Sequence, residues 1–130
     1  ERGNTVICAG GGGVPVVRED GLRGVEAVVD KDSATRLLAS ELDASALVIL
    51  TDVEYAYVDF GGPDQRPLRA VDRAELRSHL EDGEFTAGSM RPKVEACLRF
   101  VEDGGRVASI TTPENLEDAL AGTAGTRVSQ

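Results

Sequence analysis

The sequence predicts an α/β fold, a three-layer αβα sandwich with a mainly parallel, open sheet. Short apolar runs of strand length alternate with segments whose apolar residues recur every three or four positions, as on one face of a helix. One run, residues 46–50, is apolar throughout, which is typical of a strand buried on both faces of a parallel sheet. Strands that alternate with helices form right-handed crossovers, so we expect helices on both faces of the sheet.

Five segments are strand candidates. Residues 5–9 form a β-rich run that ends at four glycines, residues 10–13. Residues 46–50 and 106–110 give the clearest signals: the first run is apolar throughout, the second follows two glycines, and both end at polar residues. Residues 55–60 and 125–128 are weaker candidates, and we expect both to lie nearer an edge of the sheet.

Four helices are expected between and after these strands. Asp72 and Glu75 have the spacing of a capping box, and Gly83 and Gly104 stand where helices commonly end. The apolar positions of the four helices are Ala34, Leu37, Leu38 and Leu42; Val71, Leu76 and Leu80; Val94, Leu98 and Val101; and Leu116, Ala119 and Leu120.

Length and composition predict one domain spanning residues 1–130. We expect it to be cytoplasmic and not a membrane protein, because the longest apolar runs are too short to span a bilayer and no leader opens the sequence. A net charge of −9 and the lack of a basic stripe argue against nucleic acid as a partner. Cys8 and Cys97 have no Cys or His at metal-ligand spacing, so we expect buried free thiols and assign no metal ligands. His79 is expected on the surface.

The residues that follow each strand are the first candidates for a binding site, because ligands of open α/β sheets bind beyond the carboxyl ends of the strands. Residues 10–13, Thr51 with Asp52, and Thr111 with Thr112 hold these positions. The glycine run would let backbone amides approach an anion closely. It matches neither the P-loop pattern nor G-x-G-x-x-G, and four glycines are also typical of a flexible turn.

Lys31 and Lys93 are the only lysines among fourteen cationic residues, and each stands at the start of a predicted helix. A cation there meets the positive end of the helix dipole, which is unfavourable by roughly 0.3 to 1 kcal/mol unless an anion compensates. A bound phosphate would compensate, because helix N-termini and lysine both favour it. Asp30 and Asp32 would hold Lys31, or one of them would cap the helix. On spacing alone, solvated lysines beside capping carboxylates explain the pattern equally well.

Five segments, in this order, resemble the carbamate kinases of the amino acid kinase superfamily. They read V-V-D-K-D-S-A, L-T-D-V, G-P-D-Q-R-P-L, A-G-S-M-R-P-K-V-E-A and I-T-T-P-E-N. The resemblance extends over about residues 5–126 and implies the carboxyl-terminal, nucleotide-binding lobe of such an enzyme. We expect the family's amino-terminal lobe, with another catalytic lysine and most of the carbamate site, to be absent from residues 1–130.

The resemblance also implies catalytic roles for three residues. Lys93 would contact the ATP phosphates and stabilise charge on the transferring phosphoryl group, and Lys31 would do similar work from the opposite side. Asp32 would order the lysines by hydrogen bonding. Positioning and electrostatic stabilisation supply most of the catalysis in phosphoryl transfer. The nucleotide-binding residues implied are Gly10, Gly11, Gly12, Thr51, Asp52, Met90 and Pro113.

The function implied is the ATP/ADP-binding part of a carbamate kinase, which passes a phosphoryl group reversibly between carbamoyl phosphate and ADP to give ATP and carbamate. Mg²⁺ is expected with the nucleotide, and a homodimer is expected for the full-length family. One alternative is another amino acid kinase, such as an acetylglutamate or uridylate kinase. Another is a nucleotide-binding module without catalysis, and we expect the 130 residues alone to bind nucleotide but to be inactive.

Three further side chains are left outside the predicted site. Family members commonly have glycine where Arg91 stands, so Arg91 either adds a phosphate contact or crowds the loop. We favour an arginine that points to solvent. Tyr55 and Tyr57 alternate along a weak strand, and we favour packing roles for them over an adenine shelf.

Overall fold

A computed structural model of the chain describes residues 3–8, 13–85 and 89–130. Its centre is a four-stranded sheet, and β3 runs parallel to β7 and β6 parallel to β8, whereas β7 and β8 are antiparallel. The sheet is therefore mainly parallel, as the sequence predicts. In spatial order its strands are β3 (Leu47–Leu50), β7 (Val107–Thr111), β8 (Thr126–Ser129) and β6 (Ala70–Asp72).

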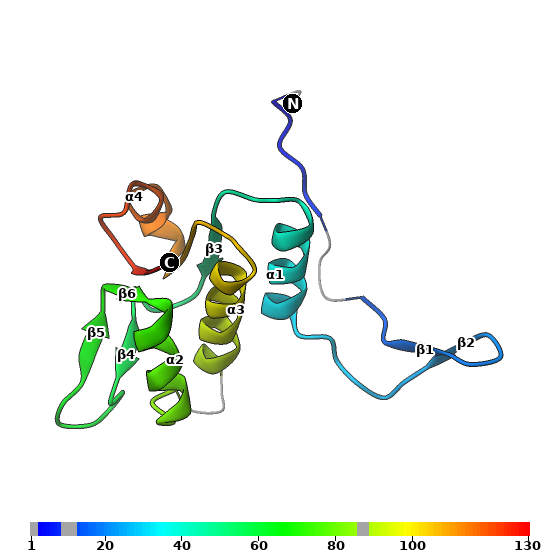
Figure 1. Cartoon of the computed structure of the whole chain (residues 1–130), viewed down its shortest axis with the longest axis horizontal. Coiled ribbons are helices and arrows are strands. Elements are labelled where there is room, and N and C mark those ends of the chain that lie inside the picture. Colours follow the sequence, from blue (N-terminus) through cyan, green and yellow to red (C-terminus); the bar gives the residue numbers. More distant parts are fainter. Residues whose placement is uncertain (1–2, 9–12, 86–88) are drawn as a thin grey trace.

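Helices lie on both faces of this sheet, which confirms the three-layer fold. On one face α3 (Met90–Glu102) lies between α1 (Lys31–Glu41) and α2 (Arg73–Glu81) and contacts β3, β7 and β8 (Figure 1). On the other face α4 (Leu116–Ala121), preceded by the short 3-10 helix η1 (Pro113–Asn115), contacts β7 and β3. None of the helices described is long and apolar enough to cross a membrane.

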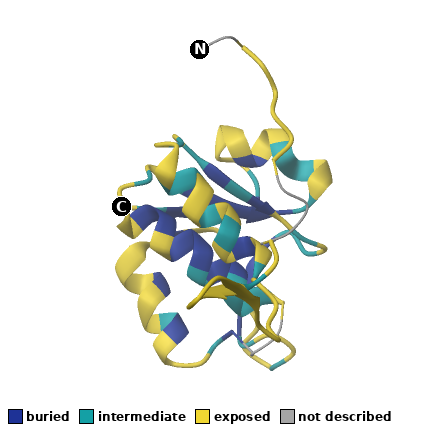
Figure 2. Ribbon diagram, turned by 90° about the vertical axis from the view of Figure 1, so that its right-hand side faces the viewer, coloured by how far each residue is buried: buried dark blue, intermediate teal, exposed yellow. Residues whose placement is uncertain are grey.

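The hydrophobic core lies between the sheet and α3, where buried residues concentrate (Figure 2). Both α2 and α3 end in Schellman turns, in which Gly83 and Gly104 adopt left-handed φ values of 77° and 106°. These helix ends are confirmed. The largest buried apolar side chains are Phe100, Leu76, Ile110, Val94, Val101 and Val128.

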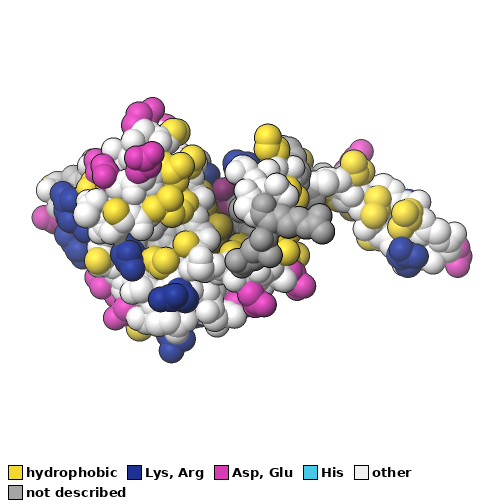
Figure 3. Space-filling model, turned by 90° about the horizontal axis from the view of Figure 1, so that it is seen from above, with side chains coloured by type: hydrophobic (Ala, Val, Ile, Leu, Met, Phe, Trp, Pro, Cys, Tyr) yellow, Lys and Arg dark blue, Asp and Glu magenta, His cyan; other side chains and the backbone are white. Residues whose placement is uncertain are grey.

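Two hairpins lie outside the central sheet. β1 (Val16–Arg18) and β2 (Leu22–Gly24) form an arm that stands off the body and exposes apolar side chains (Figures 1 and 3). β4 (Ala56–Val58) and β5 (Arg66–Leu68) form a second antiparallel pair. The Thr126 hydroxyl of β8 accepts a hydrogen bond from Ala56 N over 2.8 Å and donates one to the Leu68 carbonyl. The central sheet thereby holds the base of the β4–β5 hairpin.

The prediction of a strand at residues 5–9 was wrong for the part that the structure describes. Residues 5–8 form no strand, and Val6 and Ile7 are 72% and 99% exposed. An apolar run becomes a strand only where a neighbouring strand pairs with its backbone, and none of the described strands does so here. Cys8 is exposed, so the expectation that both thiols are buried was wrong for this one.

Three other expectations differ from the structure. Residues 125–128 were expected near an edge, but β8 lies between β7 and β6. Val71 belongs to β6 rather than to a helix, and the helix starts after Asp72, which caps it. The leucines Leu37, Leu38 and Leu42 of the first helix are 51%, 39% and 69% exposed, because α1 packs on α3 through smaller residues such as Ala39.

Candidate functional site

Asp32 lies between the two lysines. Lys93 Nζ donates to Asp32 Oδ2 over 3.0 Å, and Lys31 Nζ lies 3.7 Å from the same oxygen. The Lys93 and Asp32 side chains are 7% and 9% exposed, whereas Lys31 is 70% exposed. The structure therefore brings together the three residues predicted to be catalytic, from α1 and α3.

The start of α1 separates the roles of the two aspartates. Asp30 is the N-cap, and its carboxylate accepts a hydrogen bond from Ser33 N over 2.7 Å. Asp32 stands two residues later and is buried beside α3. The sequence left open whether these aspartates hold a lysine or cap the helix. Asp30 caps the helix, and Asp32 lies beside the lysines.

Among the residues that the structure describes, the ammonium of Lys93 donates to one partner. An ammonium has three N–H groups, and one is directed to Asp32. The ion pair compensates the buried charges, since an isolated ammonium or carboxylate at this depth would be strongly destabilised. An anion that reached Lys93 would find a cation already fixed in place, with the mobile and exposed Lys31 nearby.

The cap of α1 gives a testable pH dependence. The hydrogen bond from Ser33 N holds the pKa of Asp30 below its ordinary value of 3.8. Its stabilisation is therefore fully present above pH 3.8 and is lost as the pH falls through the lowered pKa of the folded state. We expect Asp30→Ala to lower the free energy of unfolding by about 1 kcal/mol at neutral pH. Asp30→Asn should keep the cap but remove the contribution of Asp30 to the pH dependence of the free energy of unfolding.

Urea unfolding of the three proteins, from neutral pH to below 3.8, measures this. An alanine variant as stable as the parent at neutral pH would contradict the assignment of Asp30 as the cap. A pH dependence unchanged by Asp30→Asn would contradict the role of its ionisation.

Two clefts hold most of the predicted nucleotide-binding residues. The first, which we call the Pro113 cleft, has a volume of about 490 Å³ and lies at the carboxyl ends of β3 and β7. The second, the Tyr57 cleft, has a volume of about 220 Å³ and lies beside the start of α3. The Pro113 cleft is lined by Leu50, Thr51, Asp52, Thr112, Pro113 and Glu114. The Tyr57 cleft is lined by Asp52, Val53, Tyr57, Phe60, Glu84, Phe85, Ser89 and Met90.

Four of the seven predicted nucleotide-binding residues fall in these clefts. Thr51 and Pro113 line the first, Met90 lines the second, and Asp52 borders both. Met90 precedes Lys93 by one helical turn, so the Tyr57 cleft adjoins the lysines through the start of α3. The other three predictions, Gly10, Gly11 and Gly12, lie outside the described residues.

Sequence reasoning missed the aromatic wall of the Tyr57 cleft. Tyr57 was expected to pack in the interior, but it lines the cleft together with Phe60 and Phe85. The expected packing role is correct for Tyr55, which is buried. The alternation of Tyr55 and Tyr57 was the available signal, because it places both rings on the same side of the strand. It does not tell which ring borders a cleft. The hairpin geometry shows that Tyr57 does and Tyr55 does not.

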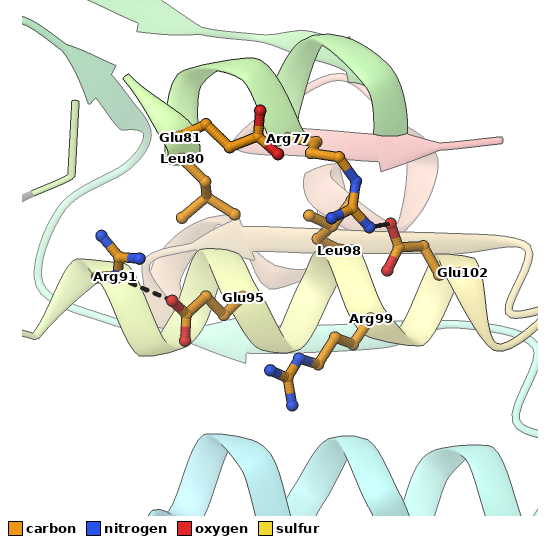
Figure 4. Close-up of a pocket in the computed structure, with 8 residues that line it drawn as sticks. All are labelled: Arg77, Leu80, Glu81, Arg91, Glu95, Leu98, Arg99 and Glu102. Carbon is orange, nitrogen blue, oxygen red and sulfur yellow. Dashed lines mark hydrogen bonds and ion pairs between the residues drawn. The ribbon is translucent and has the colours of Figure 1, made fainter. Parts of the chain in front are cut away.

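Arg91 pairs with a residue of its own helix. Its Nε donates to Glu95 Oε1 over 2.8 Å on the outer side of α3. Figure 4 shows the pair in a separate cleft of about 410 Å³ between α2 and α3, which Arg77 and Glu102 also line as an ion pair. Arg91 is 42% exposed, so the preference for an outward-pointing arginine agrees with the structure.

The remaining reactive side chains do not add to this site. Cys97 is fully buried one turn after Lys93, and burial raises the pKa of its thiol, so it stays protonated. His79 was expected on the surface, but its side chain is only 14% exposed, with Nε2 3.7 Å from Glu75 Oε1 on α2. Within residues 3–8, 13–85 and 89–130, no cluster of three or more His, Cys, Asp or Glu side chains is arranged to hold a metal ion.

Comparison with known proteins identifies the family. Residues 1–112 match the family described as the amino acid kinase family. The chain is 50% identical over 125 residues to a carbamate kinase of Thermoplasma volcanium and 50% identical over 129 residues to one of Halobacterium salinarum, covering 95% and 98% of this chain. These matches cover only 41% and 42% of the relatives, so the chain spans about two-fifths of their length.

A solved structure gives the same result. The carbamate kinase from Giardia lamblia bound to AMP-PNP superposes with a TM-score of 0.87 at 43% identity, covering 92% of this chain and 42% of that one. The sequence resemblance to carbamate kinases is thereby confirmed. The chain belongs to the amino acid kinase family.

Proposed function

We propose that this chain is the nucleotide-binding part of a carbamate kinase and that it holds the phosphates of ADP or ATP with Lys31 and Lys93. The observation that carries the proposal is the pair of lysines that share Asp32, one buried and fixed, the other exposed. Phosphoryl transfer requires positive charge fixed around the transferring group, and this arrangement supplies it. Relatives named carbamate kinase at 50% identity favour this enzyme over an acetylglutamate or uridylate kinase.

The clefts suggest how the rest of the nucleotide would bind. The Tyr57 cleft has the aromatic and apolar lining that suits a flat base, with Tyr57, Phe60 and Met90 among its residues. Asp52, which borders both clefts, would accept hydrogen bonds from ribose hydroxyls. The relative from Giardia lamblia was solved with AMP-PNP, which supports a nucleotide as the ligand of this lobe.

In the complete enzyme the reaction would move a phosphoryl group between carbamoyl phosphate and ADP, giving ATP and carbamate. Lys93 and Lys31 would neutralise the charge on the phosphoryl oxygens, and Asp32 would keep the ammonium groups in position. Mg²⁺ bound with the nucleotide would supply further positive charge at the phosphates. The phosphate contacts of Gly10, Gly11 and Gly12 and the family homodimer stay predictions.

Calorimetric titration of the chain with ADP and Mg²⁺ tests nucleotide binding. We expect binding by the parent chain and an affinity roughly 10-fold weaker after Lys31→Ala, since hydrogen bonds to charged groups are worth more than neutral ones. Arg106→Ala removes an equal charge from an exposed position and should change nothing. No binding at millimolar ADP would overturn the proposal. Equal losses of ADP affinity in the two variants would mean that Lys31 acts only through the net charge of the chain.

A chimeric enzyme tests whether this chain supports carbamate kinase catalysis. Residues 3–130 would replace the matching segment of the Thermoplasma volcanium carbamate kinase, and ATP formation from carbamoyl phosphate and ADP would be followed. We expect turnover comparable with that of the parent enzyme. A folded chimera that binds ADP but forms no ATP would instead favour a nucleotide-binding module.

A further inference from the structure

Arg69 lies outside both clefts but contacts the aromatic row that leads into one of them. It follows β5, and its Nη1 donates to the hydroxyl of Tyr55 over 2.8 Å. Its Cζ also lies 4.8 Å from the centre of the Tyr55 ring. A guanidinium can make both contacts because it is flat and carries several donors. The ring of Tyr55, which is buried, is therefore held at its face and at its hydroxyl.

The row continues from Tyr55 to the wall of the Tyr57 cleft. The rings of Tyr55 and Tyr57 meet edge to face, with centres 6.3 Å apart and planes at 89°. Tyr57 in turn lies 5.9 Å from Phe60 at 50°. Edge-to-face pairs have a preferred geometry, so the position of one ring restricts that of the next. Only Tyr57 and Phe60 of this row line the cleft.

The hairpin that carries this row is anchored at both ends. At its base the Thr126 hydroxyl joins β4 and β5 to the central sheet. Beyond β4, Asp59 N donates to Glu84 Oε2 over 2.9 Å, and Glu84 itself lines the Tyr57 cleft. With the backbone fixed at both ends, the ring of Tyr57 is the part whose angle depends on its side-chain neighbours.

We propose that Arg69 is a positioning residue which, through Tyr55, sets the angle of the Tyr57 ring and so the affinity of the Tyr57 cleft for the base of a nucleotide. This inference rests on the proposed function, because it takes the base to bind in that cleft. Arg69 touches neither cleft, so its effect is confined to the base. The phosphates, held by the lysines of α1 and α3, should not respond to it.

Two ligands separate these contributions. ADP would occupy the cleft and the lysines, whereas inorganic pyrophosphate would reach only the lysines. In calorimetric titrations Arg69→Gln should weaken ADP binding roughly 3- to 10-fold and leave pyrophosphate unchanged, which matches the strength of an aromatic pair. Tyr55→Phe should have a smaller effect of the same kind, and Arg69→Lys should restore part of the loss. Arg66→Gln, an exposed arginine on the same hairpin, is the matched control.

The outcomes are distinct. A parent chain that binds neither ligand fails the proposed function and this inference with it. A parent chain that binds both, with ADP affinity unaffected by Arg69→Gln, overturns only the positioning role. Equal losses for ADP and pyrophosphate, or an equal effect of Arg66→Gln, would also overturn it, because the change would then not be specific to the base.

A measurement without ligand gives a second test. The chain contains only two tyrosines, so fluorotyrosine labelling yields one ¹⁹F resonance for Tyr55 and one for Tyr57, assigned with Tyr57→Phe. Arg69→Gln should shift the Tyr57 resonance through Tyr55, the ring that Arg69 contacts. An unchanged Tyr57 resonance would overturn the inference.

Discussion

Replacing Lys93 with methionine is expected to lower ATP formation by the chimeric enzyme roughly 10²- to 10³-fold, the effect of removing one preorganised charge-stabilising donor. Lys93 is the lysine whose ammonium Asp32 fixes at 3.0 Å, so its loss removes a positioned charge rather than a mobile one. Arg99→Ala is the control on the same helix, because Arg99 is exposed and has no ion pair among the described residues. Equal rate losses in the two variants would contradict the assignment of Lys93.

The same substitution should also destabilise the chain, by up to about 3–5 kcal/mol, because it removes the buried partner of Asp32 and leaves only the exposed Lys31 near it. Lower activity could therefore come from unfolding, and a double variant separates the two causes. Adding Asp32→Asn removes the uncompensated charge, so the double variant should regain much of the lost free energy of unfolding. It should not regain activity. Recovery of both together would show that Lys93 acts only on stability.

Gly125→Ala is expected to lower the free energy of unfolding by about 2–5 kcal/mol. Gly125 has a left-handed φ of 73°, which costs other residues about 1–2 kcal/mol. A Cβ there would also stand 2.5 Å from the Ile110 carbonyl oxygen and 2.9 Å from Thr111 Cβ, and such overpacking costs about 1–3 kcal/mol. Because the nearest atom belongs to the backbone, the clash cannot be relieved by a change of rotamer.

Gly83→Ala is the matched control for this prediction. Gly83 has nearly the same φ, 77°, but no atom lies within 4 Å of the position that its Cβ would take. It should therefore lose only the backbone contribution of about 1–2 kcal/mol. Thermal and urea unfolding of both variants measure the difference. Equal losses of unfolding free energy in the two variants would mean that β7 leaves room for a Cβ at Gly125.

The sequence predicted those helix ends and strands that depend on interactions between residues close together in the chain. The glycines after α2 and α3 and the carboxylate before α2 mark helix ends because each satisfies backbone groups within one turn. The buried strand at residues 46–50 was evident from its continuous apolar run. The central position of β8 was not evident. Three of its four residues are polar, and buried Thr126 belongs there because its hydroxyl bonds to β4 and β5, far away in the sequence.

The site was predictable to a similar extent. The positions of Lys31 and Lys93 at helix starts indicated an anion site, and the family resemblance supplied their roles. The division of labour between Asp30 and Asp32 was not predictable, because it depends on which side of α1 faces α3. The same is true of Tyr57, whose exposure to a cleft depends on how the β4–β5 hairpin lies against the loop before α3.

The position of β8 has a consequence for how the molecule is made. β8 is the last strand in chain order among the described residues, yet it is the only link between β6 and the pair formed by β3 and β7. On the ribosome, residues up to 111 can form α3 and the β3–β7 pair, but β6 has no neighbour in the sheet until residues 126–129 have emerged. The hydrogen bonds that join the β4–β5 hairpin to the central sheet also require Thr126. Completion of the sheet therefore depends on non-local contacts with the last of its strands in chain order.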